Sequence, residues 1–295
     1  MKNIIYINAI FYLKIKMNEV SDDKHYEKCL LMKVQNIPKL KQIFKNLNDS
    51  KLLKIIMYNR KLLQKLNKDV TDYKNEYSKI IIEIFPICDR SHKRQFINLF
   101  GGESYCHIYF DDNKEETKRN YLYPDEKVIK IKVILDYKFK SLCGLFKGCS
   151  NVRKIDFIRF DRENISNMSY MFYDCANLTE LNLSNFNTNN VKDMSYMFFC
   201  CYELEELNLS NFNTNNVKDM SYIFFYCFSL KELNLSNFNT NNIKDMRDMF
   251  DDCSSLKSLN LCNLNEKSIK DINGIIGKCN SLKSLKKIIY PYKFK

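Results

Sequence analysis

Apolar and polar positions in the second half of the chain follow two patterns in turn. Leu181 and Leu183 flank one polar residue, which predicts a short strand with both leucines on one face. Val191, Met194 and Phe198 follow at spacings of three and four residues, which predicts a short helix or a series of linked turns. The Asn and Thr residues between the two stretches are typical of a turn.

This pattern returns every 26 residues, and a period of that length is typical of proteins built from stacked repeats. One repeat cannot bury its own apolar face, whereas stacked repeats share a continuous core. We therefore expect the recurring apolar positions to form buried columns. Three such columns are Cys149, Cys175, Cys201, Cys227, Cys253 and Cys279; Leu181, Leu207, Leu233 and Leu259; and Met168, Met194, Met220 and Met246.

The cysteine column is interpreted as core packing, because an unpaired cysteine behaves as a small apolar residue. Side chains stacked in one column point the same way, which disfavours disulfides between neighbours. A single-file column also does not supply four ligands in a tetrahedron, so no metal site is expected there.

The segments NMSYMFYDC (167–175) and LTELNLSNFNTNNVKDM (178–194) closely resemble the BspA-like leucine-rich repeats, also called the DUF285 repeat. The pattern L-x-x-L-x-L is that of a leucine-rich-repeat strand, although Phe186 stands where ordinary leucine-rich repeats place a buried Asn. The resemblance covers roughly residues 128–290. It implies an α/β fold, a curved leucine-rich-repeat solenoid with a parallel sheet on its concave face, and a role in adhesion or other protein–protein contact.

Three parts are expected along the chain. Residues 1–29 form a segment that weakly resembles a signal peptide, and residues 126–295 form the repeat array with a cap at each end. Residues 30–125 form a small N-terminal domain, first helical and then β-containing. Its predicted strands are Ile80–Ile84, Phe96–Phe100 and Tyr105–Phe110.

The predicted helical stretch at residues 30–75 has two interpretations. The apolar spacing from Ile37-Pro38 to Leu62 faintly resembles an F-box, which would dock a larger complex. A plain helical cap would show the same binary pattern.

The net charge of +12 is unevenly placed, because the flanks are basic and the repeats mildly acidic. No dense Arg/Lys run accompanies this charge, so a solvated surface is favoured over nucleic-acid binding. No stretch of about 18 uncharged apolar residues predicts a transmembrane segment. The repeated thiols favour a reducing, intracellular compartment, whereas the family resemblance suggests the cell surface; both stay open.

No motif for an enzyme is present: there is no P-loop, no G-x-G-x-x-G, and no nucleophile with a base at a recognisable distance. We expect no catalytic residues, no cofactor, no metal and no small-molecule substrate. Cys88, His92, Cys106 and His107 make a poor zinc set, because adjacent residues of a strand point to opposite faces.

The sequence therefore predicts a non-enzymatic module that binds an unidentified protein ligand through a repeated concave surface. The alternative is an intracellular adaptor with an F-box-like N-terminal domain and target-selecting repeats. Residues between the buried leucines should face solvent and contact the ligand: Glu180, Asn182, Ser184, Glu206, Asn208, Ser210, Glu232, Asn234, Ser236 and Asn260. A second candidate surface is formed by Tyr170, Tyr196 and Tyr222.

Overall fold

The protein is described by a computed structural model, which divides the chain into two compact units, Met1–Ser78 and Lys79–Lys295. All elements named below belong to the second unit. The predicted helical segment at residues 30–75, and with it the F-box-like interpretation, lies outside the described residues. The described residues are 78–87, 92–139, 141–160, 162, 164–261, 275, 279 and 288–289.

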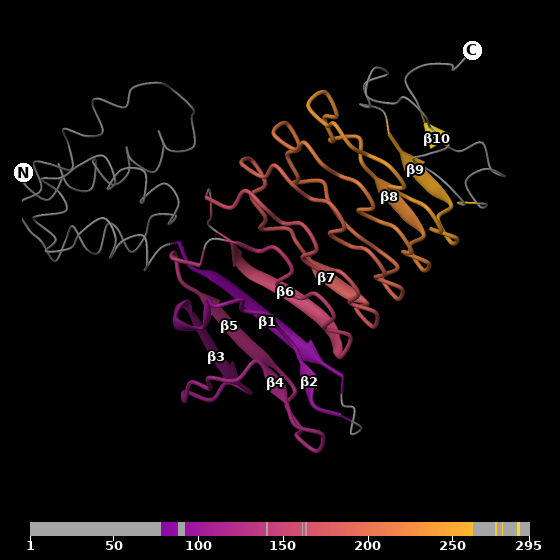
Figure 1. The fold of residues 1–295 in the computed structure, drawn as a ribbon. Helices are drawn as coiled ribbons and strands as arrows, with labels where there is room; N and C mark the ends of the chain where they lie inside the picture. The colour runs from indigo at the N-terminus through magenta and orange to yellow at the C-terminus, as the bar shows by residue number, and fades with distance from the viewer. Residues whose placement is uncertain are drawn as a thin grey trace, which may run out of the picture. The chain divides into compact units, whose positions relative to one another are not determined.

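A five-stranded mixed sheet opens the second unit (Figure 1). The strand order is β3-β5-β1-β6-β7. The pairs β3–β5, β5–β1 and β1–β6 are antiparallel, and the pair β6–β7 is parallel. Residues alternate between the core and the outside, as in β1, where Ile80, Ile82 and Ile84 are fully buried. The bounds are Ile80–Pro86 for β1, Cys106–Phe110 for β3, Ile131–Leu135 for β5, Val152–Phe160 for β6 and Glu180–Asn182 for β7.

Two smaller sheets and one short helix complete the named elements. β8, β9 and β10 form a parallel sheet, and β2 pairs with β4 in an antiparallel ladder. Their bounds are Arg94–Gln95 for β2, Glu103–Tyr105 for the 3-10 helix η1, Tyr121–Leu122 for β4, Glu232–Asn234 for β8, Ser258–Asn260 for β9 and Ile288–Ile289 for β10.

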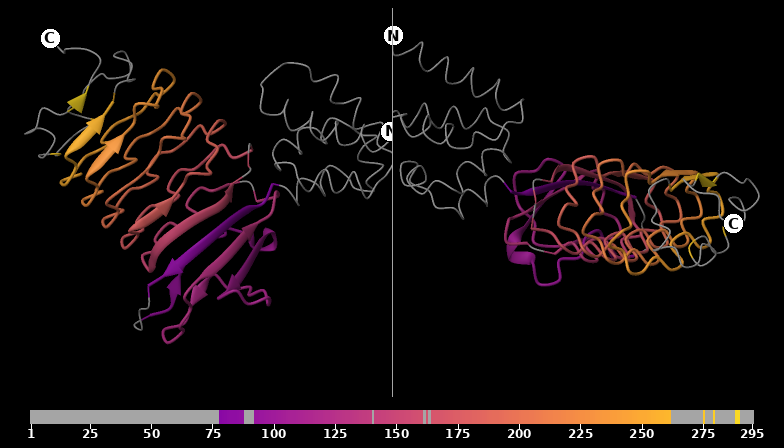
Figure 2. Two further views of the ribbon diagram at one scale, coloured as in Figure 1. Left: turned by 180° about the vertical axis from the view of Figure 1, so that it is seen from behind. Right: turned by 90° about the horizontal axis from the view of Figure 1, so that it is seen from above.

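Consecutive 26-residue repeats lie side by side in register (Figures 1 and 2). The backbone N–H of Tyr170 donates to the carbonyl of Ser195 at 3.0 Å, and the N–H of Tyr196 donates to Ser221 at the same distance. Parallel bridges join Asp193 to Asp219, and Asp219 to Asp245 of the next repeat. Backbone hydrogen bonds therefore run from repeat to repeat, outside the named strands as well as within them.

The helix-like spacing in each repeat comes from linked turns. Met171 N–H donates to the carbonyl of Met168, three residues back, while Phe172 N–H donates to Met197 of the next repeat. Tyr170 and Asp174 have positive φ angles of 57° and 56°, which interrupt any helix. The spacing of the apolar residues allowed either a short helix or linked turns, and the protein contains the turns.

The predicted α/β leucine-rich-repeat solenoid is wrong. No α-helical run longer than one residue occurs among the described residues, because the segment expected to be helical consists of turns bonded to the next repeat. The strands form three separate sheets, the largest of them mostly antiparallel, rather than one curved parallel sheet. The described fold is mostly β.

The part preceding the repeats also differs from expectation in detail. β1 and β3 lie where strands were predicted, but the strand predicted for Phe96–Phe100 is wrong. That segment is irregular, with the N–H of Asn98 donating to the carbonyl of Leu145 at 2.7 Å.

One buried cation joins this sheet to the repeats. Arg162 is 1% exposed, and its guanidinium donates to the carbonyls of Tyr137 and Phe139 at 2.9 and 2.8 Å. It donates to the carbonyls of Leu135 and Asp136 as well. Burial lowers the pKa of Arg162 to about 10, so it stays charged at neutral pH.

Candidate protein-binding surfaces

The strand face is the set of exposed residues between the buried leucines, where the sequence predicted ligand contacts. Of the ten predicted residues, eight are exposed, while Ser236 and Asn260 are half-buried. Leu207, Leu233 and Leu259 are buried beneath them, and Leu181 is only partly buried. The structure therefore brings the predicted columns together on one side of the repeats.

The glutamates of the strand face differ in their surroundings. Glu180 forms ion pairs with Lys154 at 3.1 Å and with Arg153 at 2.8 Å. The hydrogen bond from Lys154 is the main cause of the lowered pKa of the Glu180 carboxyl. Glu206 and Glu232 lie opposite each other across a parallel bridge. Within the described part of the chain, neither of these two carboxylates forms an ion pair, so two like charges stand one strand spacing apart.

The asparagines of the strand face have a structural role in addition to any contact with a ligand. The Oδ1 of Asn208 accepts the backbone N–H of Ser210 at 3.0 Å, and the equivalent bonds of Asn182 and Asn234 measure 3.1 and 3.0 Å. Each is an Asx-turn, and Asn182 and Asn234 are the last residues of β7 and β8. The side-chain oxygens are thus occupied within the repeat.

A second surface, the aromatic face, contains two columns of stacked rings that come from the linked turns. Tyr170, Tyr196 and Tyr222, predicted as a candidate surface, stack with ring centroids 4.7 Å apart. The second column had not been predicted: Tyr173, Phe199 and Phe225 stack at 4.7 and 5.1 Å. The same 26-residue period was present in the sequence and would have revealed it.

Opposite charges mark the two ends of the aromatic face. The Nζ of Lys147 lies 5.1 Å from the ring centroid of Tyr170 and 4.8 Å from that of Tyr173, within cation–π distance. At the other end Asp248 follows Tyr222 in the first column. Burial and a hydrogen bond with Asp248 raise the pKa of Tyr222.

Residues 140–258 and 201–288 match the model of the family described as "Mycoplasma protein of unknown function, DUF285". The chain belongs to the DUF285 family. No curated protein and no solved structure matches it. The family part of the resemblance is thereby confirmed, and the family's description assigns no activity.

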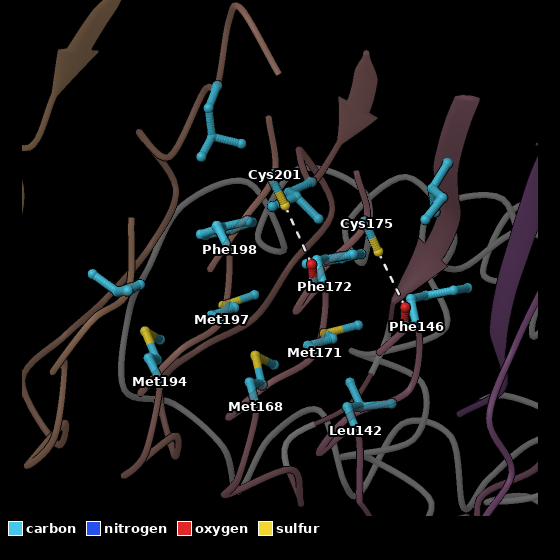
Figure 3. Close-up of a cluster of buried hydrophobic side chains, with 14 of the residues drawn as sticks. Leu142, Phe146, Met168, Met171, Phe172, Cys175, Met194, Met197, Phe198 and Cys201 are labelled. Carbon is cyan, nitrogen blue, oxygen red and sulfur yellow. Dashed lines mark hydrogen bonds between the residues drawn. The ribbon is translucent and has the colours of Figure 1, made fainter. Parts of the chain in front are cut away.

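Both surfaces lie within the DUF285 match. Figure 3 shows part of the buried columns of the same repeats. The Sγ atoms of Cys175 and Cys201 donate to the carbonyls of Phe146 and Phe172 at 3.1 and 3.2 Å. All six column cysteines are free and buried, and the four methionines of the third column are 0–6% exposed. Burial raises the pKa of the Cys201 thiol well above its ordinary value.

His107 and Cys106, two of the residues considered as a zinc set, lie in the mixed sheet of this DUF285 protein. His107 lies between Glu116 and Asp136, at 3.2 Å from Nδ1 and 3.1 Å from Nε2. Cys106, its neighbour, is buried, and burial raises its thiol pKa to about 12. In the described ranges no three His, Cys, Asp or Glu side chains gather as a metal site would require.

No helix among the described residues is both long and apolar enough to span a membrane.

Proposed function

We propose that this DUF285 protein is a non-enzymatic interaction module that binds a basic protein ligand through its strand face. The observation that carries the proposal is the pairing of Glu206 with Glu232 across a parallel bridge. Like charges directly opposite each other destabilise a sheet, and a basic ligand would relieve this repulsion. Complementary charge also steers association and selects the partner.

The non-enzymatic part of the proposal is supported by the state of the thiols. Cysteine attacks as the thiolate, and burial raises the pKa of the Cys175 and Cys201 thiols well above the ordinary value. Both side chains are fully buried. At neutral pH these thiols are protonated and shielded from a substrate, so their role is packing.

Repetition supports a protein ligand over a small one. The strand face presents similar residues at one strand spacing, from Glu180 through Asn234, on successive repeats. Such a row offers several equivalent contacts along an extended partner. Stacked-repeat proteins commonly bind partners across surfaces of this kind.

The test begins with capture of proteins from a lysate of the source cells on the immobilised full chain. A captured protein is then purified and its affinity measured for wild type and for the double variant Glu206→Lys/Glu232→Lys. We expect at least a tenfold loss of affinity, because two attractive pairs become repulsive.

The matched control is Glu115→Lys/Glu203→Lys, which changes the net charge equally at two exposed residues outside the strand face. The control should bind like wild type. Equal affinity of the strand-face variant and wild type would contradict the proposed site. Failure of wild type to retain any protein would contradict the proposed function.

A further inference from the structure

The aromatic face is an apolar surface with six partly exposed rings in two parallel columns. Rings within a column stack nearly parallel, at 6° for Tyr170–Tyr196 and 2° for Phe199–Phe225. Stacking covers the flat sides of the rings and leaves their edges for a partner. Aromatic residues of this kind are enriched in protein–protein interfaces. The six are Tyr170, Tyr196, Tyr222, Tyr173, Phe199 and Phe225, all half-buried.

Further rings extend this face beyond the two columns. Phe100 is 73% exposed, and its ring lies 3.3 Å from the position that a Cβ on Gly144 would occupy. Gly144 precedes Tyr170 by one repeat, so the glycine leaves room for Phe100 at the end of the column. Phe228, 40% exposed, lies 5.3 Å from the ring of Tyr226, which is in turn 4.3 Å from the ring of Phe225 in the second column. Contiguous exposed apolar surface of this kind marks an interaction site.

The charges along the second column are arranged with opposite signs at its two ends. At one repeat per step the column reads Lys147, Tyr173, Phe199, Phe225, Asp251. Lys147 is exposed and Asp251 is half-buried, with its Oδ1 accepting the backbone N–H of Asp252 at 3.0 Å. Phe199 therefore stands midway between a cation and an anion.

From this arrangement we propose that the aromatic face binds a second copy of this chain in a two-fold symmetric, antiparallel dimer. A two-fold interface brings one patch against itself, so the patch must be complementary to itself. With the axis through Phe199 and perpendicular to the columns, Lys147 of each copy meets Asp251 of the other. Tyr173 meets Phe225, and Phe199 meets its own copy.

The parallel alternative, with the axis along the columns, is disfavoured by the same charges. It would place Lys147 against Lys147 and Asp251 against Asp251, and like-charge contacts in an interface cost several kcal/mol. The antiparallel arrangement is the one in which both ends attract. It uses none of the residues of the strand face.

The experiment measures the mass of the full chain in solution by sedimentation across a concentration series. Wild type is expected to dimerise. Lys147→Asp and Asp251→Lys are each expected to weaken dimerisation at least tenfold, because each creates two like-charge contacts in its own homodimer. An equimolar mixture of the two variants is expected to recover dimers, since both contacts then join opposite charges.

The double variant Lys147→Asp/Asp251→Lys should also dimerise like wild type, because the swap restores both pairs. Lys192→Asp, an exposed lysine outside the aromatic face, is the control and should leave the mass unchanged. Thermal unfolding of each variant verifies that it folds. A monomeric wild type would overturn the proposal, and this is the result expected if the aromatic face binds a different protein instead. A mixture that stays monomeric while both single variants fold would overturn it too.

Discussion

The Sγ of Cys227 lies 3.2 Å from the carbonyl oxygen of Phe198, a residue of the preceding repeat. The same carbonyl also accepts the backbone N–H of Cys201 at 3.1 Å. Cys253 repeats the relationship with Phe224 at 2.9 Å. Each thiol therefore fills the core and donates a hydrogen bond across a repeat boundary, which ties one repeat to the next.

Replacing Cys227 by Ala should lower the free energy of unfolding by about 1–2 kcal/mol, through a small cavity and one lost hydrogen bond. Chemical denaturation measures the change. Cys106→Ala is the control, since Cys106 is a free and buried thiol that lies outside the repeats. Equal effects at the two sites would show that the inter-repeat thiol has no special role.

Stability should fall in alkaline solution. Burial raises the pKa of the thiols of Cys149, Cys175, Cys201 and Cys227 above their ordinary value. In the unfolded chain a thiol ionises near pH 8.5, so above that pH the unfolded state has lost protons that the folded state retains. The thiol contribution is therefore complete below about pH 8 and is lost as the pH rises, by up to about 1.4 kcal/mol per pH unit for each thiol.

Urea denaturation at pH 7, 8, 9 and 10 follows this loss. The variant Cys227→Ala provides the matched comparison, because it has one fewer buried thiol and should show a shallower decline above pH 9. A stability that stays constant between pH 8 and pH 10 would contradict burial of the protonated thiols.

Replacing Arg162 by Met should destabilise the protein by about 3–5 kcal/mol. The methionine would keep much of the volume but would leave the buried carbonyl of Phe139 and its neighbours without their charged donor. Arg162→Lys should be destabilising too, because one ammonium does not reproduce a planar fork that reaches four carbonyls. Arg159→Met, near the end of β6 and only half-buried, is the control; equal melting temperatures for Arg162→Met and wild type would refute the role of Arg162.

The two kinds of glutamate on the strand face should respond oppositely to the same substitution. Glu206→Lys replaces a like-charge pair with Glu232 by an attractive one and should stabilise the fold by about 0.2–1 kcal/mol. Glu180→Lys removes the contacts with Arg153 and Lys154 and should destabilise it. The two variants carry the same net charge, so their difference in denaturation midpoint reports the local pairing, and no difference would contradict it.

Much of the repeat packing was predictable because a fixed period places equivalent residues above one another. The cysteine and methionine columns are buried, as are Ile80, Ile82 and Ile84, which alternate with more exposed residues along β1. The interior of an individual repeat was less predictable. Leu181 is only partly buried, because its strand lies where the mixed sheet ends at β7.

The 26-residue period was sufficient to determine which residues stack in columns, because stacking of equivalent positions depends only on spacing along the chain. Only the tertiary structure decided between helix and turns, since Phe172 bonds to Met197, 25 residues away, and local spacing is the same for either. It also decided the sheet topology, in which β1 pairs with β5 and β6. Every residue except proline has the same backbone N–H and C=O groups, so side-chain patterns do not show which distant segments these groups join. For that reason the pairing of the strands could not be predicted from the sequence.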